Sequence, residues 1–231
     1  SLDSMFSLAG KKALIAGASR GIGLAIAKAT AAAGAHTILA ARSADALEEA
    51  VAAIEQTGYS AQALALDVGN LESINSVTVA HPDIDILVNV AGTNIRKPFE
   101  QYTREDYELL MQTNLHGVAE LTRKVGVTMI ERGAGGKIVQ IGSLMSLRGL
   151  PYVAVYAMAK SGLAGLTRAL AAEWGKFDIQ VNCIAPGFIL TDLNREMWQS
   201  PELKQWLAGA QANPRLGTPE DVAGAVAFLA S

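Results

Sequence analysis

The sequence has little that could bind a metal or form disulfides, with one cysteine and three histidines among its 231 residues. A single cysteine excludes a disulfide within the chain, and Cys183 lies in the apolar run 179–184, where a small buried thiol is its ordinary role. His36, His81 and His116 share no metal-ligand spacing, so we expect no metal site. The cysteine usage favours a reducing compartment, and we expect a cytoplasmic protein.

Charged residues are also scarce. They make up 18 % of the chain against 50 % hydrophobic residues, and the formal net charge is −3. No basic cluster stands out, which argues against nucleic acid or an anionic membrane surface as a partner. No apolar run reaches the roughly 18 residues of a membrane-spanning helix, and no secretory signal opens the sequence. The apolar composition instead suggests that other subunits cover part of the surface, in a homodimer or homotetramer.

Apolar runs alternate with helical patterns along the whole chain. We expect strands at 12–16, 37–41, 61–66, 84–88, 137–141 and 179–184, and helices at 24–33, 44–57, 71–79, 104–129, around Tyr156 to 174, 193–212 and 218–230. Thr103, with Asp106 three residues on, is the expected cap of the helix at 104–129. Strands that are apolar along their full length indicate a parallel sheet covered on both faces, so the fold class is α/β, doubly wound. We expect a single domain over 5–231, and residues 1–4 look like a cloning remnant before Met5.

A glycine-rich turn, Gly17-x-x-x-Gly21-x-Gly23, lies between the first strand and the first helix. In a doubly wound fold this turn binds a pyrophosphate, because glycines let the backbone approach and the helix N-terminus attracts the anion. The spacing differs from the commonest dinucleotide fingerprint, G-x-G-x-x-G. A turn needed only for tight packing of strand and helix is the alternative.

Arg42 ends the second strand, where an NAD-binding protein would carry an acidic residue for the ribose 2′-hydroxyl. A guanidinium there could bind a 2′-phosphate instead, and Arg20 in the glycine turn could supply a second cation. We therefore expect NADP(H) as the preferred cofactor, with NAD(H) possible. The alternative is that Arg42 is only a solvated residue at a helix start.

Tyr156 and Lys160 stand four residues apart, a spacing that puts both on one face of a helix. A phenol has an unperturbed pKa of about 10, and a neighbouring cation lowers that pKa. Tyr156 could thereby exchange a proton near neutral pH. Ser143 follows the strand 137–141, where its hydroxyl could point into a cleft. A tyrosine and a lysine on an ordinary amphipathic helix are the alternative.

Together these segments resemble the short-chain dehydrogenase/reductase family. The matching residues stand in the family's order and spacing: Ala16 to Gly23, Asp67-Val68, Asn89-Val-Ala-Gly92, Asn114, Ser143, Tyr156-x-x-x-Lys160 and Pro186-Gly187. The pattern covers nearly the whole chain and is far more specific than any one motif in it. The resemblance implies a Rossmann-type domain that reduces a carbonyl or oxidises an alcohol with a nicotinamide cofactor.

The resemblance also implies a role for each catalytic residue. Tyr156 is the general acid/base, and Lys160 lowers its pKa and hydrogen-bonds the nicotinamide ribose. Ser143 polarises the substrate carbonyl, and Asn114 holds a water that connects Lys160 to solvent. The chemistry agrees, because two hydroxyls that converge on the carbonyl oxygen stabilise the negative charge that builds there.

Further cofactor contacts implied by the resemblance come from the glycine turn and from the strand ends. The full set is Gly17, Ser19, Arg20, Gly21, Ile22, Gly23, Arg42, Asp67, Val68, Asn89, Ala91, Gly92, Tyr156, Lys160, Pro186, Gly187, Ile189 and Thr191. Asn, Asp and Gly are also ordinary residues at strand ends.

The chain departs from the family pattern in three places. Val90 stands where a second Asn is usual, the connection from Leu71 to Asp83 is short, and the sequence ends at Ser231 without the usual C-terminal strand. That strand lies at a common subunit interface, so its absence bears on the oligomer geometry. The catalytic residues are not affected.

Two segments, 92–99 and 142–149, resemble gluconate 5-dehydrogenases and related sugar-acid or polyol dehydrogenases. Arg96 or Arg148 could bind a substrate carboxylate, although either could be a surface cation. The expected substrate contacts are Arg96, Ser143, Met145, Arg148 and Tyr156. The apolar stripe in 193–212 suggests either a lid over a bulkier substrate or core packing.

The leading hypothesis is an NADP(H)-dependent oxidoreductase that acts on a small molecule, a keto-sugar acid or a polyol. A 3-oxoacyl thioester reductase shares the same motifs and is the alternative within the enzyme class. A catalytically silent dinucleotide-binding module is the alternative from another class, and the intact set of Asn114, Ser143, Tyr156 and Lys160 argues against it.

Overall fold

The computed structural model describes residues 5–231, so the expected remnant at 1–4 lies outside the described residues. Six parallel strands form one sheet in the order β3-β2-β1-β4-β5-β6. The strands are β1 (Lys12–Ala16), β2 (His36–Ala41), β3 (Ala61–Ala65), β4 (Ile86–Asn89), β5 (Gly136–Ile141) and β6 (Ile179–Ile184). The strand order reverses between β1 and β4, and a doubly wound sheet binds its ligands outside the carboxyl ends of the strands at that point.

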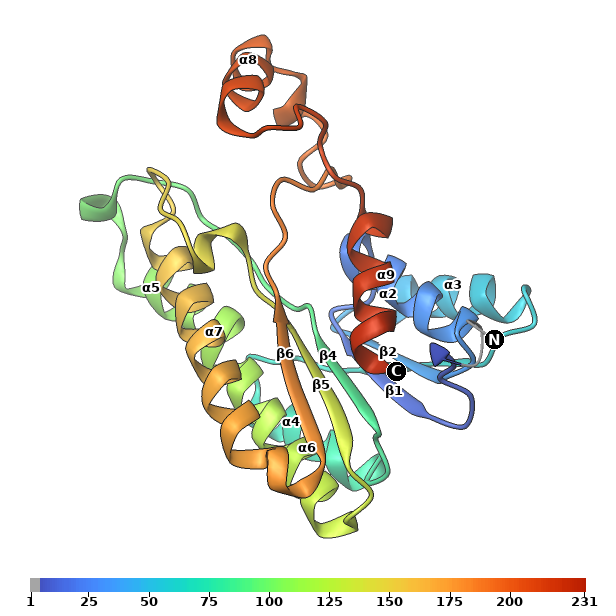
Figure 1. Ribbon diagram of the computed structural model, residues 1–231. Coiled ribbons are helices and arrows are strands. Elements are labelled where there is room, and N and C mark those ends of the chain that lie inside the picture. The colour runs from blue at the N-terminus through green and yellow to red at the C-terminus, as the bar shows by residue number, and fades with distance from the viewer. Residues whose placement is uncertain (1–4) are drawn as a thin grey trace.

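Helices cover both faces of the sheet, as Figure 1 shows. One face carries α2 (Gly21–Ala32), α3 (Ala44–Glu55) and α9 (Pro219–Ala230), and the other carries α4 (Leu71–Ala80), α6 (Gly117–Arg132) and α7 (Ala154–Trp174). Ile15 of β1 packs with the first group, whereas its neighbour Leu14 packs with the second. Successive strand residues point to opposite faces, so a strand buried on both must be apolar throughout. The expected fold class is confirmed.

The edge strand β3 differs from the inner strands. Only its first residue, Ala61, is buried and the other four are half-buried or exposed, whereas β4 is buried along its whole length. Only β2 pairs with β3, so the side chains of β3 are covered less completely. The uniformly apolar pattern therefore holds for the inner strands and not for this edge.

The helix expected at 104–129 is interrupted. Thr103 caps α5 (Arg104–Met111) and forms the expected capping box with Asp106, but a π-helical turn, η2 (Gln112–His116), follows before α6 begins. A π turn inserts an extra residue into a helix and is frequent at functional sites. Hydrophobic periodicity continues across such a turn, which is why the sequence pattern did not reveal it.

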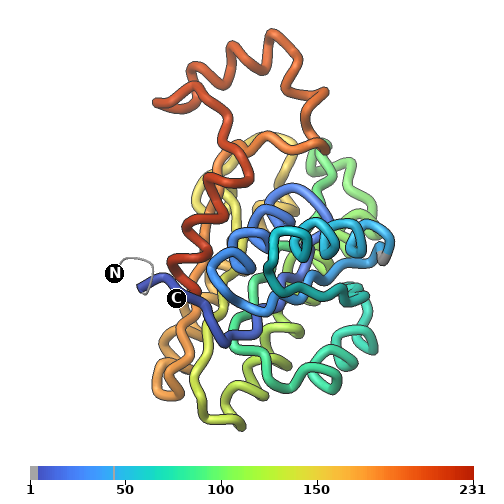
Figure 2. The backbone as a smooth tube through the Cα atoms, turned by 90° about the vertical axis from the view of Figure 1, so that its right-hand side faces the viewer, coloured from blue at the N-terminus to red at the C-terminus, as the bar shows by residue number. Residues whose placement is uncertain are grey.

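The connection from β6 to α9 leaves the body of the molecule, as Figures 1 and 2 show. Its two ends meet where Ile189 pairs with Gly217 in an isolated parallel bridge. Between them lie η5 (Met197–Gln199) and α8 (Pro201–Ala210), in place of one helix over 193–212. The ring of Phe188 contacts those of Trp198 and Trp206 at centroid distances of 5.7 and 5.3 Å. The apolar stripe thus packs within this connection.

Three short 3₁₀ turns complete the structure: η1 (Phe99–Gln101), η3 (Leu144–Ser146) and η4 (Gly175–Phe177). The described part of the chain ends on α9, and Phe228 near its end contacts Phe6 at a centroid distance of 5.9 Å. Among the helices described for residues 5–231, none combines the length and apolar character needed to cross a membrane.

Candidate active site

The π turn η2 positions Asn114 with its side chain fully buried. The Nδ2 of Asn114 donates to the carbonyls of Leu110 (2.9 Å) and Thr93 (2.8 Å), and its Oδ1 accepts the N–H of Thr93 (3.2 Å). This reciprocal pair with Thr93 attaches the loop after β4 to the helix. Thr93 therefore supports the site through its backbone, a role that side-chain motifs do not reveal.

Ser143 follows β5 and caps η3, where its Oγ accepts the N–H of Met145 at 3.1 Å. Ser146 completes the turn, because its Oγ accepts the N–H of Ser143 (3.2 Å) and donates to the carbonyl of Lys160 (2.9 Å). The turn that carries Ser143 is thereby joined to the middle of α7. No sequence motif identifies Ser146, apart from its closeness to Ser143.

Tyr156 and Lys160 lie one turn apart on α7, as their spacing predicts. The Nζ of Lys160 lies 5.7 Å from the centroid of the Tyr156 ring and donates to the carbonyl of Ile141 at 2.8 Å. Ser143 interacts with the Tyr156 phenol, so the structure brings these three side chains together. Lys160 is only 3 % exposed, and its amine is thus a buried charge at the end of β5.

Burial dominates the proton affinities of this pair. Burial raises the pKa of Tyr156, and the interaction with Ser143 opposes the increase. Burial lowers the pKa of Lys160 to about 8, because a desolvated ammonium is disfavoured. The decrease in the pKa of Tyr156 expected from Lys160 is therefore not observed. The lysine amine donates its hydrogen bond to the Ile141 carbonyl and lies over the phenol ring, 5.7 Å from the ring centroid.

Gly92 lies against both Asn114 and Lys160. A Cβ at this position would stand 2.7 Å from the Oδ1 of Asn114 and 3.6 Å from the Nζ of Lys160. The loop after β4 can approach these two side chains only because residue 92 lacks a side chain. Asn114, Ser143, Tyr156 and Lys160 are thus gathered at the carboxyl ends of β4 and β5.

The glycine-rich turn serves packing and leaves the start of α2 open. A Cβ on Gly23 would come within 1.8 Å of the Gly17 carbonyl oxygen, so Gly23 is required for close packing within the turn. Gly21 has φ +55° and faces the methyl of Thr191, which would lie 3.4 Å from a Cβ. Arg20 precedes the helix without capping it through its side chain. Free N–H groups at an uncapped helix start suit an anion, so these residues fit a pyrophosphate.

Other expected cofactor residues surround this end of the sheet. Arg20, Arg42 and Asp67 are exposed, and the Oδ1 of Asp67 accepts the N–H of Gly69 at 2.8 Å. The half-buried Ser19 and Ile22 belong to the glycine turn. The half-buried Ala91 follows β4, and the exposed Gly187 and half-buried Ile189 follow β6. The carbonyl of Pro186 accepts the N–H of Leu144 at 2.8 Å, which joins the end of β6 to η3.

Two residues expected to contact the cofactor, Asn89 and Val68, have side chains buried in the core instead. The Nδ2 of Asn89 donates to the Oγ1 of Thr122 (3.0 Å) and the Oε1 of Gln140 (2.9 Å). This triad is fully enclosed between β4, β5 and α6, so the Asn89 side chain braces the core. Val68 is also buried, and its carbonyl lies where Gly117 permits close approach of α6.

The expected substrate residues are divided between surface and core. Arg96 and Arg148 are exposed, each in a loop at the catalytic end of the sheet. Met145 is 6 % exposed, so its side chain packs in the core. The two arginines are therefore available to a ligand, whereas the methionine acts through the backbone of η3.

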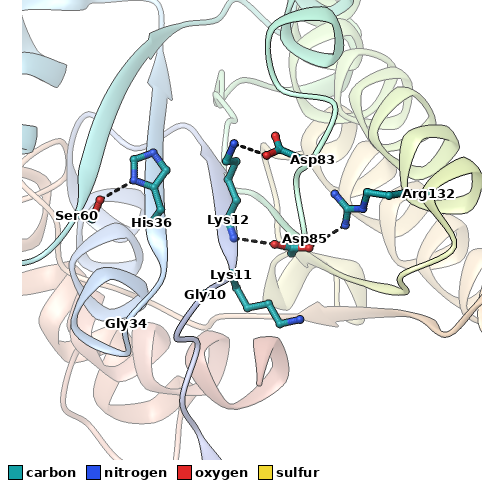
Figure 3. A pocket seen from close by; sticks show the side chains of 9 residues that line it. All are labelled: Gly10, Lys11, Lys12, Gly34, His36, Ser60, Asp83, Asp85 and Arg132. Carbon is teal, nitrogen blue, oxygen red and sulfur yellow. Dashed lines mark hydrogen bonds and ion pairs between the residues drawn. The ribbon is translucent and has the colours of Figure 1, made fainter.

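A groove of about 500 Å³ lies at the opposite end of the sheet, where the strands begin, and Figure 3 shows its lining. Lys12 pairs with Asp83 at 2.6 Å, and Arg132 pairs with Asp85 at 2.8 Å. His36 and His81, which are far apart in sequence, both contact Gln62. None of the expected catalytic residues lines this groove, so its size does not identify it as the active site.

Comparisons with known proteins agree with this geometry. A family model described as enoyl-(acyl carrier protein) reductase matches residues 17–231. A gluconate 5-dehydrogenase from Gluconobacter oxydans is 38 % identical over 231 residues, which span 98 % of this chain and 90 % of the relative.

Two solved structures are similarly close. One is a gluconate 5-dehydrogenase from Burkholderia cenocepacia in complex with NADP and tartrate, with a TM-score of 0.95, 34 % identity, and coverage of 100 % of this chain and 92 % of the other. The second is a 3-oxoacyl-(acyl-carrier-protein) reductase from Agrobacterium tumefaciens with NADP bound, with a TM-score of 0.93, 32 % identity, and coverage of 100 % and 91 %.

Proposed function

The chain belongs to the short-chain dehydrogenase/reductase family, and we propose that it is an NADP(H)-dependent oxidoreductase. It interconverts a ketone and a secondary alcohol on a sugar acid or a polyol. The observation that carries the proposal is the convergence of Ser143, Tyr156 and Lys160 beside Gly92 and Asn114 at the carboxyl ends of β4 and β5.

In this proposal the nicotinamide cofactor supplies or accepts the hydride. Ser143 donates a hydrogen bond to the substrate carbonyl oxygen, and Tyr156 delivers the proton to it. Both hydroxyls meet an oxygen on which negative charge grows, so they stabilise the transition state more than the ground state. Because burial raises the pKa of Tyr156, the phenol stays protonated near neutral pH and can act as the acid in ketone reduction.

Lys160 maintains the positive charge beside this acid, and Asn114 holds the loop that carries Gly92 and Thr93. The ammonium of Lys160 would also reach the cofactor ribose. Its pKa of about 8 leaves most of the lysine protonated at pH 7. The buried ammonium therefore keeps a positive charge near the phenol when Tyr156 gives up its proton.

The preference for NADP(H) is supported by two exposed guanidiniums at the carboxyl end of β2 and in the glycine turn, Arg42 and Arg20. Guanidinium groups form charge-assisted, often bidentate, hydrogen bonds with phosphate. Similar proteins of known structure carry NADP. We assign Gly17, Ser19, Gly21, Ile22 and Gly23 to the phosphates. The remaining proposed contacts are Asp67, Ala91, Gly92, Pro186, Gly187, Ile189 and Thr191, whereas the side chains of Val68 and Asn89 are buried in the core.

A sugar acid as substrate is supported by the gluconate 5-dehydrogenase relatives and by the exposed Arg96 and Arg148. One neighbour's structure contains tartrate, a hydroxylated acid. A guanidinium in either loop would bind the substrate carboxylate. The second candidate is a 3-oxoacyl thioester reductase, which the second structural neighbour favours.

A substrate panel with NADPH tests the function. The panel contains keto-gluconates, polyol ketones and a 3-oxoacyl thioester, and consumption of NADPH is followed by absorbance. We expect the keto-gluconates to be reduced most efficiently, and Arg96→Ala to raise their KM. Unchanged turnover of the sugar acids by that variant would contradict the carboxylate contact, and preferential turnover of the thioester would favour the second candidate.

Tyr156→Phe separates catalysis from binding. The variant keeps the ring but lacks the proton, so we expect its kcat to fall by roughly 10²–10⁴-fold while it still binds NADPH. Full activity of this variant would refute the proton-donor role. Binding of NADPH without turnover of any ketone by the wild-type protein would instead favour a silent dinucleotide-binding module.

We also propose that the protein is a homodimer or homotetramer in the cytoplasm. Exposed apolar side chains on α5, α6 and α7 support the association: Leu109, Val127 and Met158. Their burial against a second copy would remove apolar surface from water. Light scattering coupled to size exclusion tests the oligomeric state, and a monomer at micromolar concentration would contradict it.

A further inference from the structure

Tyr152 has an unusual backbone conformation just before α7. Among the non-glycine residues that the structure describes, only Tyr152 and Asp178 have positive φ, at 70° and 58°. Aspartate tolerates the left-handed region because its short polar side chain can bond locally, but a bulky residue there is a genuine outlier. The backbone at Tyr152 is therefore strained.

Hydrogen bonds from the loop after β4 hold this conformation. The carbonyl of Tyr152 accepts the N–H of Lys97 at 3.1 Å. The hydroxyl of Tyr102 donates to the carbonyl of Ile95 at 2.5 Å and lies 3.4 Å from the Tyr152 carbonyl. Lys97 also pairs with Asp106 in the first turn of α5. The turn before α7 and the loop after β4 are thus tied together, and Figure 1 shows them side by side above α5 and α7.

The side chain of Tyr152 adds little packing to the fold that could offset this backbone strain. It is 57 % exposed, so less than half of the side chain is buried. Glycine or asparagine would adopt the same backbone at lower cost, since neither meets the steric penalty of a bulky residue there. Strained residues that the surrounding structure holds in place cluster at ligand clamps and active sites. The exposed ring therefore points to a partner outside the fold.

The location of Tyr152 identifies that partner. It lies four residues before Tyr156, just ahead of α7, and its carbonyl accepts the N–H of Lys97, the residue after Arg96. A substrate whose carbonyl meets Tyr156 and whose carboxylate meets Arg96 would pass this position. A tyrosine offers an apolar face together with a hydroxyl that donates and accepts, which suits a carbon chain bearing hydroxyls.

We infer that Tyr152 is a specificity-determining residue, which contacts the hydroxylated part of the substrate remote from the reacting carbonyl. The inference rests on the proposed function for the identity of that substrate. It assigns Tyr152 no part in proton transfer or in cofactor binding. Its removal should accordingly change substrate affinity and leave the chemical step intact.

Tyr152→Asn tests the inference, because asparagine keeps the left-handed backbone and removes the ring. We expect KM for a keto-gluconate to rise at least about fivefold, with kcat and the KM for NADPH within twofold of wild type. Turnover of hydroxyacetone, which has no remote chain, should not change. Tm should rise by about 2–4 °C as the strain is relieved. Tyr152→Phe, which removes only the hydroxyl, should raise the keto-gluconate KM by a smaller factor at unchanged Tm.

Asp178→Gly is the matched control, because it relieves the other positive-φ position at the far end of the sheet. It should leave both KM values unchanged. A keto-gluconate KM of Tyr152→Asn within twofold of wild type would overturn the inference. Equal losses on the keto-gluconate and hydroxyacetone, or a fall in Tm, would overturn it as well.

Failure of the proposed substrate has a different signature. If the wild-type protein reduces no keto-gluconate, the sugar-acid assignment fails, and the comparison is made with the best large ketone of the panel against hydroxyacetone. A selective KM increase on the large ketone would support the role of Tyr152 for that substrate. Equal kinetics on both ketones would overturn it.

Discussion

Lys160 is a buried ammonium whose solvation loss is only partly offset. Its Nζ donates one hydrogen bond, to Ile141, and its pKa is lowered from 10.5 in the unfolded chain to about 8 by burial. Below pH 8 the residue is protonated in both states, so the whole penalty is present. Between pH 8 and 10.5 the folded state binds fewer protons than the unfolded state, and stability rises with pH. The buried lysine therefore destabilises the fold fully at every pH below about 8 and less above it.

Replacing Lys160 should abolish activity and increase the stability of the fold. Lys160→Met removes the buried charge, and we expect the free energy of unfolding at pH 7 to rise by about 1–3 kcal/mol, less than the full penalty because the Ile141 carbonyl loses its donor. The difference from wild type should shrink as the pH rises from 8 to 10, while activity is lost throughout. Denaturant unfolding at several pH values measures this. A Lys160→Met variant less stable than wild type at pH 7 would contradict this prediction. The control is Lys28→Met at an exposed lysine, which should change neither the free energy of unfolding nor the activity.

Gly92 offers a test of the site geometry at the level of a single methyl group. Gly92→Ala would place a Cβ 2.7 Å from the Oδ1 of Asn114, which the neighbouring hydrogen bonds prevent from moving freely. We expect ketone reduction to fall at least about tenfold, because displacements near 1 Å at a reacting centre have such effects. Gly224→Ala on α9 is the control, since nothing lies within 4 Å of its Cβ. Wild-type rates for Gly92→Ala would show that Asn114 need not stay in place.

At the scale of elements, the π turn η2 determines where Asn114 points. Such turns insert a single residue into an α-helix, so deletion of Thr113 should join α5 and α6 into one regular helix. Asn114 would then lose its bonds to Leu110 and Thr93. We expect a folded protein with wild-type helix content by circular dichroism and at least about 100-fold lower kcat. An active deletion variant would mean that the π geometry is dispensable.

Elements of this chain were predictable where one physical signal dominated. The inner strands and the capping box of Thr103 follow directly from apolar runs and cap chemistry. The π turn could not be predicted, because periodicity reports which face is apolar and not which carbonyl each N–H binds. The position of Asn89 at a strand end suggested a cofactor contact, but its amide completes a buried triad with Thr122 and Gln140. Such a core contact depends on elements that are distant in sequence.

The pKa values of the site's side chains are harder to predict from the sequence than the positions of those side chains. The i, i+4 spacing correctly predicted that Tyr156 and Lys160 share a face of α7. It could not predict that burial would raise the pKa of Tyr156, since desolvation depends on elements distant in sequence. The chemistry of the site is thus readable from motifs, but its energetics depend on packing.

At the scale of the whole molecule, the candidate site joins two halves of the sheet. The glycine turn and Arg42 belong to the β1–β3 half, whereas Ser143 and Tyr156 follow β5 in the other. The halves also meet where Gly21 faces Thr191. A ligand that contacts both would bind the folded chain and not the unfolded one. Its binding should therefore raise the stability of the entire domain.

Thermal shifts then report cofactor choice without any turnover. NADPH at 100 times its Kd should stabilise the fold by about 2.7 kcal/mol, which for a domain of this size raises Tm by about 5–10 °C. NADH at the same concentration should give a smaller shift, because Arg42 and Arg20 have no 2′-phosphate to bind. Arg42→Asp should reverse the order, since a carboxylate repels that phosphate and accepts a ribose hydroxyl. Equal shifts from the two cofactors with the wild-type protein would mean that Arg42 does not select between them.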